Sequence, residues 1–211
     1  MIKVGLTGNY CSGQNEVSKI FDSLDVKVFD ADLLLKYLLN YSKKHILKIK
    51  STFGENSYSM GLLNLHKFED TKKWNKLIDE VEFDIYTSYE KFRQKHKEDF
   101  YTVFKYSYIF ERQLNTSMDF NINCFRPKAL RKEDISLLTP LSDYLINKIL
   151  DSEYSEFLKN KNADFIIQNY PKEGVVKLDE KVRTTHEKIM NKKPQVNNFD
   201  LGYKEVSGFW D

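Results

Sequence analysis

The sequence has few cysteines and no long apolar segment. Cys11 and Cys124 are the only cysteines among the 211 residues, which is too few for a disulfide framework, and they lack the paired spacing of a zinc site. The mean hydropathy is −0.57, and no apolar run approaches the roughly 18 residues that cross a bilayer. The first residues do not form a basic region followed by a long apolar stretch, so the sequence does not indicate a secretory signal. We therefore expect a cytoplasmic protein that neither depends on disulfides nor spans a membrane.

Neither sign of charge dominates the chain. The 33 basic and 31 acidic residues leave a formal net charge of +2, so the strongly basic surface typical of nucleic-acid binding is not indicated. Only five of the basic residues are arginine and 28 are lysine, alongside 16 asparagines and three alanines. This skew indicates a compositional bias toward lysine and asparagine. The absence of a lysine where function would require one therefore cannot be explained by this bias.

The first forty residues predict a βαβ unit. Apolar residues at positions 2, 4 and 6 indicate a buried strand, a helical spacing follows from 17 to 24, and 26–29 indicates a second strand. Such a unit implies parallel strands and a right-handed crossover. Further strands are predicted at 100–104, 120–125 and 164–167, and helices at 33–41, 45–53, 74–92, from about 127, at 141–158 and at 178–190. An α/β fold with a five-stranded parallel sheet follows.

A loop with two glycines joins the first strand to the first helix. It reads Gly8-Asn9-Tyr10-Cys11-Ser12-Gly13-Gln14-Asn15. A phosphate-binding loop needs glycines there, because backbone N–H groups approach the phosphates closely at a helix N-terminus. Its pattern is GxxxxGK[ST], in which the lysine reaches the β and γ phosphates and the hydroxyl binds Mg²⁺. Here the glycines have the right spacing, but Gln14 and Asn15 replace the last two residues. The glycines alone also suit an ordinary strand-to-helix turn.

Two acidic residues follow the second predicted strand. They are Asp30 and Asp32, in the sequence Val28-Phe29-Asp30-Ala31-Asp32. The C-terminal ends of neighbouring parallel strands open into the same crevice, so these carboxylates should face the loop. Asp30 is the candidate catalytic residue, either as the base for an acceptor hydroxyl or as a partner of Mg²⁺ through water.

With these motifs the chain resembles the dephospho-CoA kinase family, P-loop enzymes that use ATP to phosphorylate the ribose 3′-hydroxyl of dephospho-CoA. The segments that carry the resemblance are Val4-Gly5-Leu6-Thr7-Gly8, Ser12-Gly13, Val28-Phe29-Asp30-Ala31-Asp32, Phe53-Gly54, Phe110-Glu111, Pro127 and Ala163-Asp164-Phe165-Ile166-Ile167-Gln168-Asn169. The resemblance implies a doubly wound P-loop kinase domain at 1–190, with a helical substrate-binding lobe at 55–98 and a lid region at 127–160. A C-terminal tail at 191–211 would follow.

The resemblance also implies ligands and site residues. The ligands would be ATP with Mg²⁺ and a CoA-like small molecule, without nucleic acid or membrane partners. The nucleotide would be bound by Gly8, Asn9, Tyr10, Cys11, Ser12, Gly13, Gln14 and Asn15, with Arg126 and Arg131 as phosphate contacts because the arginine fork suits phosphate. Asn15 would be a weak Mg²⁺ ligand, and Asp32 would position the acceptor. Glu111 would anchor the acceptor ribose or cap a helix.

The chain departs from the family pattern where phosphate chemistry is concentrated. Gln14 carries no charge, and an amide at Asn15 is a poorer Mg²⁺ partner than a hydroxyl. Leu65 and Asp134 stand where the family has arginine, and Ser107 stands where it has proline. The lysine bias does not explain the absence of lysine at position 14.

Three functions remain open on these residues. The first is a dephospho-CoA kinase-type phosphotransferase whose catalysis is weakened or lost. The second is a non-catalytic module on the same fold, a pseudoenzyme that binds a nucleotide, a CoA-like ligand or another protein. The third is a kinase for another nucleotide-like acceptor. The sequence leaves the acceptor and the oligomeric state open.

Overall fold

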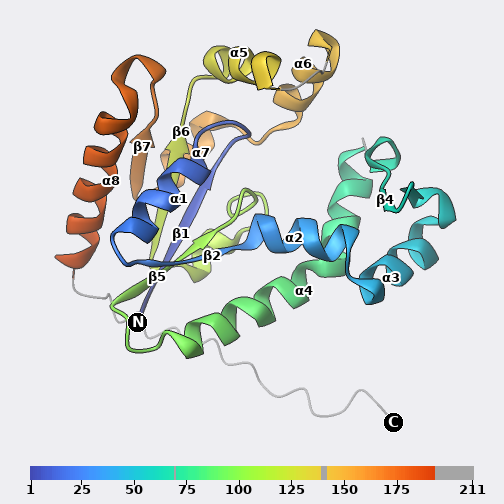
Figure 1. Ribbon diagram of the computed structural model, residues 1–211, viewed down its shortest axis with the longest axis horizontal. Coiled ribbons are helices and arrows are strands. Elements are labelled where there is room, and N and C mark those ends of the chain that lie inside the picture. The colour runs from blue at the N-terminus through green and yellow to red at the C-terminus, as the bar shows by residue number, and fades with distance from the viewer. Residues whose placement is uncertain (69, 139–141, 193–211) are drawn as a thin grey trace.

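A five-stranded parallel sheet forms the centre of the computed structural model, which describes residues 1–68, 70–138 and 142–192. The strand order is β2-β5-β1-β6-β7 (Figure 1). The strands are β1 (Ile2–Gly8), β2 (Lys27–Asp30), β5 (Tyr101–Lys105), β6 (Phe120–Phe125) and β7 (Phe165–Gln168). The central β1 pairs in parallel with β5 and β6. The predicted parallel sheet is therefore confirmed, and the C-terminal ends of its strands meet at one edge.

Helices cover both faces of this sheet (Figure 1). One face packs against α1 (Gln14–Ser23) and α8 (Gly174–Met190), where Val17 and Val182 join the apolar residues of β1 in one core. The other face packs against α2 (Ala31–Asn40) and α4 (Thr71–Lys95), where Leu35 and Tyr89 join Phe104 in a second core. Two separate cores, one on each face, make this a doubly wound α/β fold.

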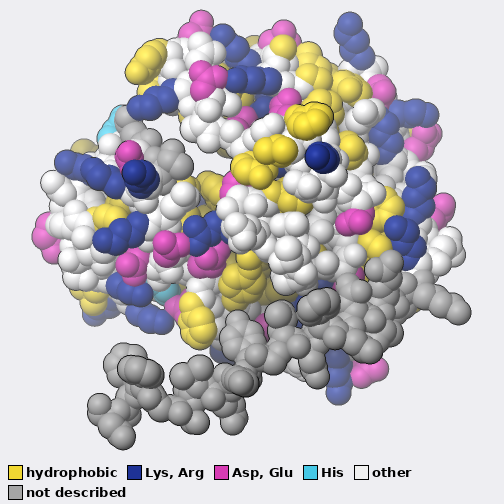
Figure 2. All heavy atoms as spheres, turned by 180° about the vertical axis from the view of Figure 1, so that it is seen from behind, with side chains coloured by type: hydrophobic (Ala, Val, Ile, Leu, Met, Phe, Trp, Pro, Cys, Tyr) yellow, Lys and Arg dark blue, Asp and Glu magenta, His cyan; other side chains and the backbone are white. Residues whose placement is uncertain are grey.

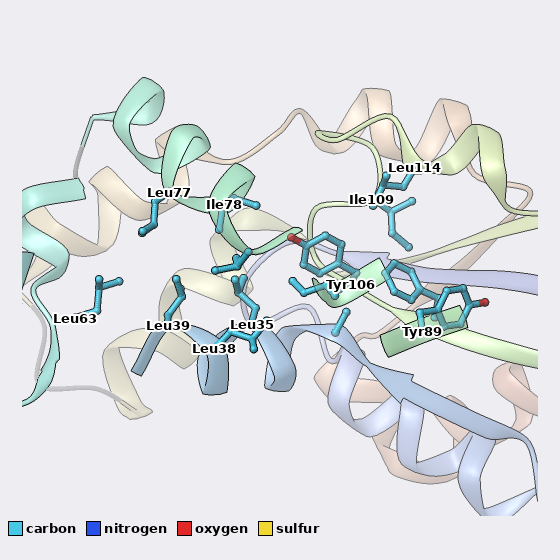
Figure 3. Packing of buried hydrophobic residues seen from close by; sticks show 14 of the residues in the cluster. Leu35, Leu38, Leu39, Leu63, Leu77, Ile78, Tyr89, Tyr106, Ile109 and Leu114 are labelled. Atoms are coloured by element: carbon cyan, nitrogen blue, oxygen red, sulfur yellow. The ribbon is translucent and has the colours of Figure 1, made fainter. Parts of the chain in front are cut away.

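A helical lobe extends from the second face. It consists of α2, α3 (Lys43–Phe53) and the far end of α4, together with a small antiparallel hairpin of β3 (Tyr58–Ser59) and β4 (Leu62–Leu63). Figure 3 shows leucines of α2 facing Leu77 and Ile78 of α4, with Tyr106 and Tyr89 continuing the packing toward the sheet. Short 3-10 helices lie in this part of the chain at Glu55–Ser57 and Leu65–Phe68, and outside it at Leu114–Ser117 and Pro171–Glu173. The lobe is thus anchored to the sheet by one continuous apolar cluster.

The segment after β6 forms three helices, α5 (Lys128–Leu138), α6 (Asp143–Ser152) and α7 (Glu156–Asn162). The prediction of one continuous helix over 141–158 was wrong. Glu153 takes up an extended backbone, and Ser155 caps α7 by accepting the Leu158 N–H. Serine favours this role because its side-chain oxygen satisfies a backbone donor that has no partner inside the helix. The break carries Glu153 and Tyr154 back toward the start of α1.

Other expectations concern charge, thiols and membranes. Figure 2 shows basic and acidic side chains interspersed over the visible face. Cys11 and Cys124 are free thiols, as predicted. No helix in the described part of the chain has the length and apolarity to cross a bilayer. The predicted tail falls almost wholly at 193–211, outside the described residues.

Candidate functional site

The loop between β1 and α1 is compact, and both of its glycines are sterically required. A Cβ at Gly8 would lie 2.3 Å from Ser12 Oγ and 2.6 Å from the Cys124 carbonyl oxygen. Gly13 has φ +100°, and a Cβ there would lie 2.0 Å from Asn169 Nδ2. The same Asn169 amide donates to the Ser12 carbonyl at 3.0 Å. Close packing from β6 and from the end of β7 therefore dictates the loop conformation.

The loop ends at the N-terminus of α1, where the first backbone N–H groups of a helix have no partner within it. The helix dipole favours a negative charge at this place. Ser12 Oγ and Gln14 Oε1 are buried and lack a hydrogen-bond partner among the described residues. Because buried polar atoms are ordinarily hydrogen-bonded, these two atoms fit a site that a polar ligand completes.

Gln14 folds back onto the loop that it follows. Its Nε2 donates to the Gly8 carbonyl at 2.8 Å and reaches Ser107 Oγ at 3.4 Å. Ser107, just after β5, in turn donates its Oγ–H to Asp32 Oδ2 at 3.0 Å and its backbone N–H to Oδ1 at 3.0 Å. A chain of hydrogen bonds therefore links the loop to Asp32.

The two predicted carboxylates have different surroundings. Asp30 Oδ1 accepts the Leu33 N–H and caps α2, while Oδ2 accepts the Lys105 ammonium at 2.7 Å. Asp32 lies further from Lys105, with 3.9 Å between Oδ2 and Nζ. Burial raises the pKa of Asp32, against the lowering effect of the Ser107 hydrogen bonds and Lys105. Both carboxylates lie at the C-terminal edge of the sheet, but β2 is not the neighbour of β1 as expected, because β5 lies between them. Asp32 is therefore linked to the loop through Ser107, which follows β5.

Two buried lysines complete the site. Lys105 comes from β5 and is 4% exposed, and Lys159 comes from α7 and is 1% exposed. The Lys159 ammonium lies 2.8 Å from Glu111 Oε1, 3.0 Å from the Ser107 carbonyl and 3.5 Å from the Gly8 carbonyl. The sequence analysis missed both lysines. Lys105 directly follows the predicted strand 100–104, so the rule that residues at the C-terminal ends of parallel strands line one crevice could have identified it, as it identified Asp30. Lys159 belongs to no motif.

The two arginines predicted to contact phosphate are buried and paired with acids. Arg131 is fully buried and donates to the Tyr10 carbonyl at 3.0 Å, to Glu153 at 2.7 and 2.8 Å, and to Glu156 at 2.5 Å. Arg126 pairs with Asp134 at 2.5 Å. The acids therefore neutralise the charge that the arginines bring to the loop.

Residues of the α6–α7 connection also contact the loop directly. The Tyr10 N–H donates to Glu153 Oε1 at 2.8 Å, and Asn9 Nδ2 donates to the Tyr154 carbonyl at 3.1 Å. Cys11 packs against the small apolar cluster between α5 and α6. Burial raises the pKa of Glu153, and Arg131 counteracts it. Residues 153 and 154, which belong to the segment predicted as a lid, thus lie against the loop.

The donors present do not fit a Mg²⁺ ion held by the protein itself. Asn15, the predicted metal ligand, is exposed at the first turn of α1. Asp30 already binds Lys105 with one oxygen and caps a helix with the other. Across the described residues, no group of three or more His, Cys, Asp or Glu side chains is arranged to hold a metal.

Comparisons with known proteins identify the family of this chain. The sequence profile of the dephospho-CoA kinase family matches residues 2–173. A dephospho-CoA kinase of Clostridium perfringens is 27% identical over 184 residues, covering 80% of this chain and 89% of its own. That of Clostridium tetani is 23% identical over 180 residues, covering 80% and 78%.

Solved structures show the same fold. A protein from Thermus thermophilus aligns with a TM-score of 0.75 at 18% identity, over 90% of this chain and 98% of its own. The dephospho-CoA kinase from Campylobacter jejuni aligns with a TM-score of 0.54 at 19% identity, over 89% and 96%. A shikimate kinase from Bacteroides thetaiotaomicron aligns with a TM-score of 0.51 at 12% identity, over 90% and 98%. The architecture is therefore that of P-loop kinases.

Proposed function

The chain belongs to the dephospho-CoA kinase family, and on that premise we propose that it binds ATP at the 8–15 loop and phosphorylates the ribose 3′-hydroxyl of dephospho-CoA. The observation that carries this proposal is the hydrogen-bond chain from Gln14 through Ser107 to Asp32. In this chain of hydrogen bonds, a single residue, Ser107, separates the Asp32 carboxylate from the 8–15 loop. A kinase needs this arrangement, because the acceptor hydroxyl must meet both the terminal phosphate and a proton acceptor.

Asp32 is the better candidate for that proton acceptor. Sequence reasoning favoured Asp30, but Asp30 holds the Lys105 ammonium and caps α2 with its two oxygens. Burial raises the pKa of Asp32, which makes its carboxylate a stronger base. In the reaction the acceptor oxygen forms a bond to the terminal phosphorus, the bond to the leaving ADP oxygen breaks, and the hydroxyl proton moves to Asp32.

Glu111 suits a contact with the acceptor. One of its oxygens binds Lys159, and the other, Oε2, is buried and lacks a partner within the part of the chain that is described. Such an oxygen can accept a hydrogen bond from a ribose hydroxyl. Figure 2 shows a notch between the α5–α6 segment and the helical lobe, and an acceptor as long as dephospho-CoA would lie there.

We expect slow catalysis. The loop lacks its own lysine, and removing one preorganised donor at such a site costs roughly 10² to 10³ in rate. The test is an ADP-release assay with purified protein, ATP, Mg²⁺ and dephospho-CoA, with Asp32→Asn as the background. Turnover above that background supports the kinase, and its absence contradicts it. A parallel panel with nucleoside monophosphates identifies a different acceptor.

One contact favours the second candidate, a non-catalytic ligand-binding module. Glu153 occupies the Tyr10 N–H and the Arg131 fork, both of which a phosphate would need. A chain relieved of selection for turnover tolerates such a contact. Isothermal titration separates the two candidates, because ATP binding without turnover supports the module and turnover supports the kinase.

A further inference from the structure

Two side chains from distant parts of the sequence converge on one carbonyl oxygen of the loop. Gln14 Nε2 donates to the Gly8 carbonyl at 2.8 Å, and the Lys159 ammonium reaches the same oxygen at 3.5 Å. Both also contact Ser107, through its hydroxyl and its carbonyl respectively. The Lys159 ammonium therefore lies beside the end of the side chain at position 14, where a phosphate loop would carry its lysine.

The contacts of this ammonium leave it able to bind a phosphate. A lysine has three N–H donors, and here they face Glu111 Oε1 at 2.8 Å, the Ser107 carbonyl at 3.0 Å and the Gly8 carbonyl at 3.5 Å. The longest and weakest of these contacts points to the loop. A phosphate oxygen can take over that N–H while the other two contacts persist.

The surroundings indicate a polar ligand and a rigid cation. Ser12 Oγ and Asn123 Oδ1 are buried without a partner among the described residues, and both residues line one narrow recess together with Lys159. The Ser155 cap and the Glu156 pair with Arg131 hold the start of α7 in place. A buried, preorganised charge interacts more strongly with an anion than an exposed one does.

We propose that Lys159 is the phosphate-binding cation of this loop, supplied from α7 in place of the lysine that position 14 lacks. The inference rests on the proposed function, and its ligand class is the polyphosphate group of a nucleoside triphosphate. Glu111 moderates the charge of Lys159 through their ion pair. Lys159 would thus connect the phosphate loop with the acceptor side of the site.

The test is a set of variants titrated calorimetrically with inorganic tripolyphosphate and with ATP. Lys159→Gln should lower both affinities about tenfold or more, the size of one lost charged hydrogen bond. The matched control is Lys161→Gln, an exposed position on the same helix, which should leave both affinities unchanged. Gln14→Lys in the Lys159→Gln background should restore most of the loss and should gain less in the native background.

Glu111→Gln separates a phosphate contact from a purely structural ion pair. If Lys159 binds phosphate, removing its acidic partner raises tripolyphosphate affinity, so the two variants act in opposite directions. If the pair only supports the fold, both variants lower affinity and melting temperature together, and the proposal is overturned. Equal affinities of Lys159→Gln and Lys161→Gln overturn it too, as does a native chain that binds neither probe. Tripolyphosphate binding without phosphorylation of dephospho-CoA contradicts only the kinase assignment.

Discussion

The Glu153 carboxylate accepts the backbone N–H of Tyr10 at 2.8 Å, inside the loop that is proposed to hold phosphate. The same carboxylate binds the buried Arg131 guanidinium at 2.7 and 2.8 Å. A carboxylate and a phosphate compete for the same donors, because both are anions that accept backbone and guanidinium N–H groups. The α6–α7 connection thus places an internal anion against the loop.

Replacing Glu153 with glutamine should increase nucleotide affinity. The amide oxygen can still accept the Tyr10 N–H, but the negative charge that competes with phosphate is gone. We expect affinity for ATP to rise about tenfold by isothermal titration, since hydrogen bonds to charged groups are stronger than neutral ones. Asp151→Asn is the control, because Asp151 is an exposed acid paired with Lys128 near the end of α6. Equal affinities of the two variants would contradict the competition.

The competition should weaken as the pH falls. Burial raises the pKa of Glu153, while Arg131 and Lys159 counteract it, so this carboxylate takes up its proton at a higher pH than an exposed glutamate. The charged form competes with phosphate and the neutral form does not. The affinity difference between native protein and Glu153→Gln should therefore shrink as the pH is lowered from neutrality, at a higher pH than the titration of an exposed glutamate would give. Tripolyphosphate titrations at decreasing pH measure it, and a constant difference would count against the effect.

Asp32→Asn should strongly reduce turnover without unfolding the protein. The asparagine can keep hydrogen bonds to Ser107, but it cannot take the acceptor proton, so turnover should fall by about 10² to 10⁴. Because burial raises the pKa of Asp32, native turnover should decline as the pH falls through a value above the ordinary range of an aspartate. Asp22→Asn, at an exposed position on α1, serves as the control. Retention of turnover within a few-fold of that control would exclude Asp32 as the base.

Lys105→Met should destabilise the fold. Lys105 is 4% exposed and holds Asp30 at 2.7 Å, so its loss leaves a carboxylate without its cation. Asp30 retains side-chain exposure of 34%, and water therefore moderates the loss to about 2 kcal/mol of unfolding free energy, below the range for fully buried pairs. Urea denaturation measures it. The double variant Asp30→Asn with Lys105→Met should recover part of the loss, and strict additivity would argue against the pair.

Most of the fold could be predicted from the sequence because strand and helix periodicity is local. The five strands lie within a few residues of their predicted positions. The contacts that require Gly8 and Gly13, with Ser12, Cys124 and Asn169, come from the tertiary structure and were not predicted. The α6–α7 break was missed because apolar residues continue at helical spacing across it. The extended backbone of Glu153 is decided by the Ser155 cap and by the contacts of Glu153 with the loop and Arg131.

Local sequence patterns suffice to place a two-glycine loop without a lysine after the first strand and two carboxylates at the end of the second. How these charges are compensated depends on the folded arrangement of residues far apart in the sequence. Lys105 neutralises Asp30, and Lys159 reaches Gly8 from 151 residues away in the chain. Electrostatic energy depends on how far apart two charges lie in the folded protein and on how deeply they are buried. Neither quantity can be read from the spacing of lysines in a chain that contains 28 of them.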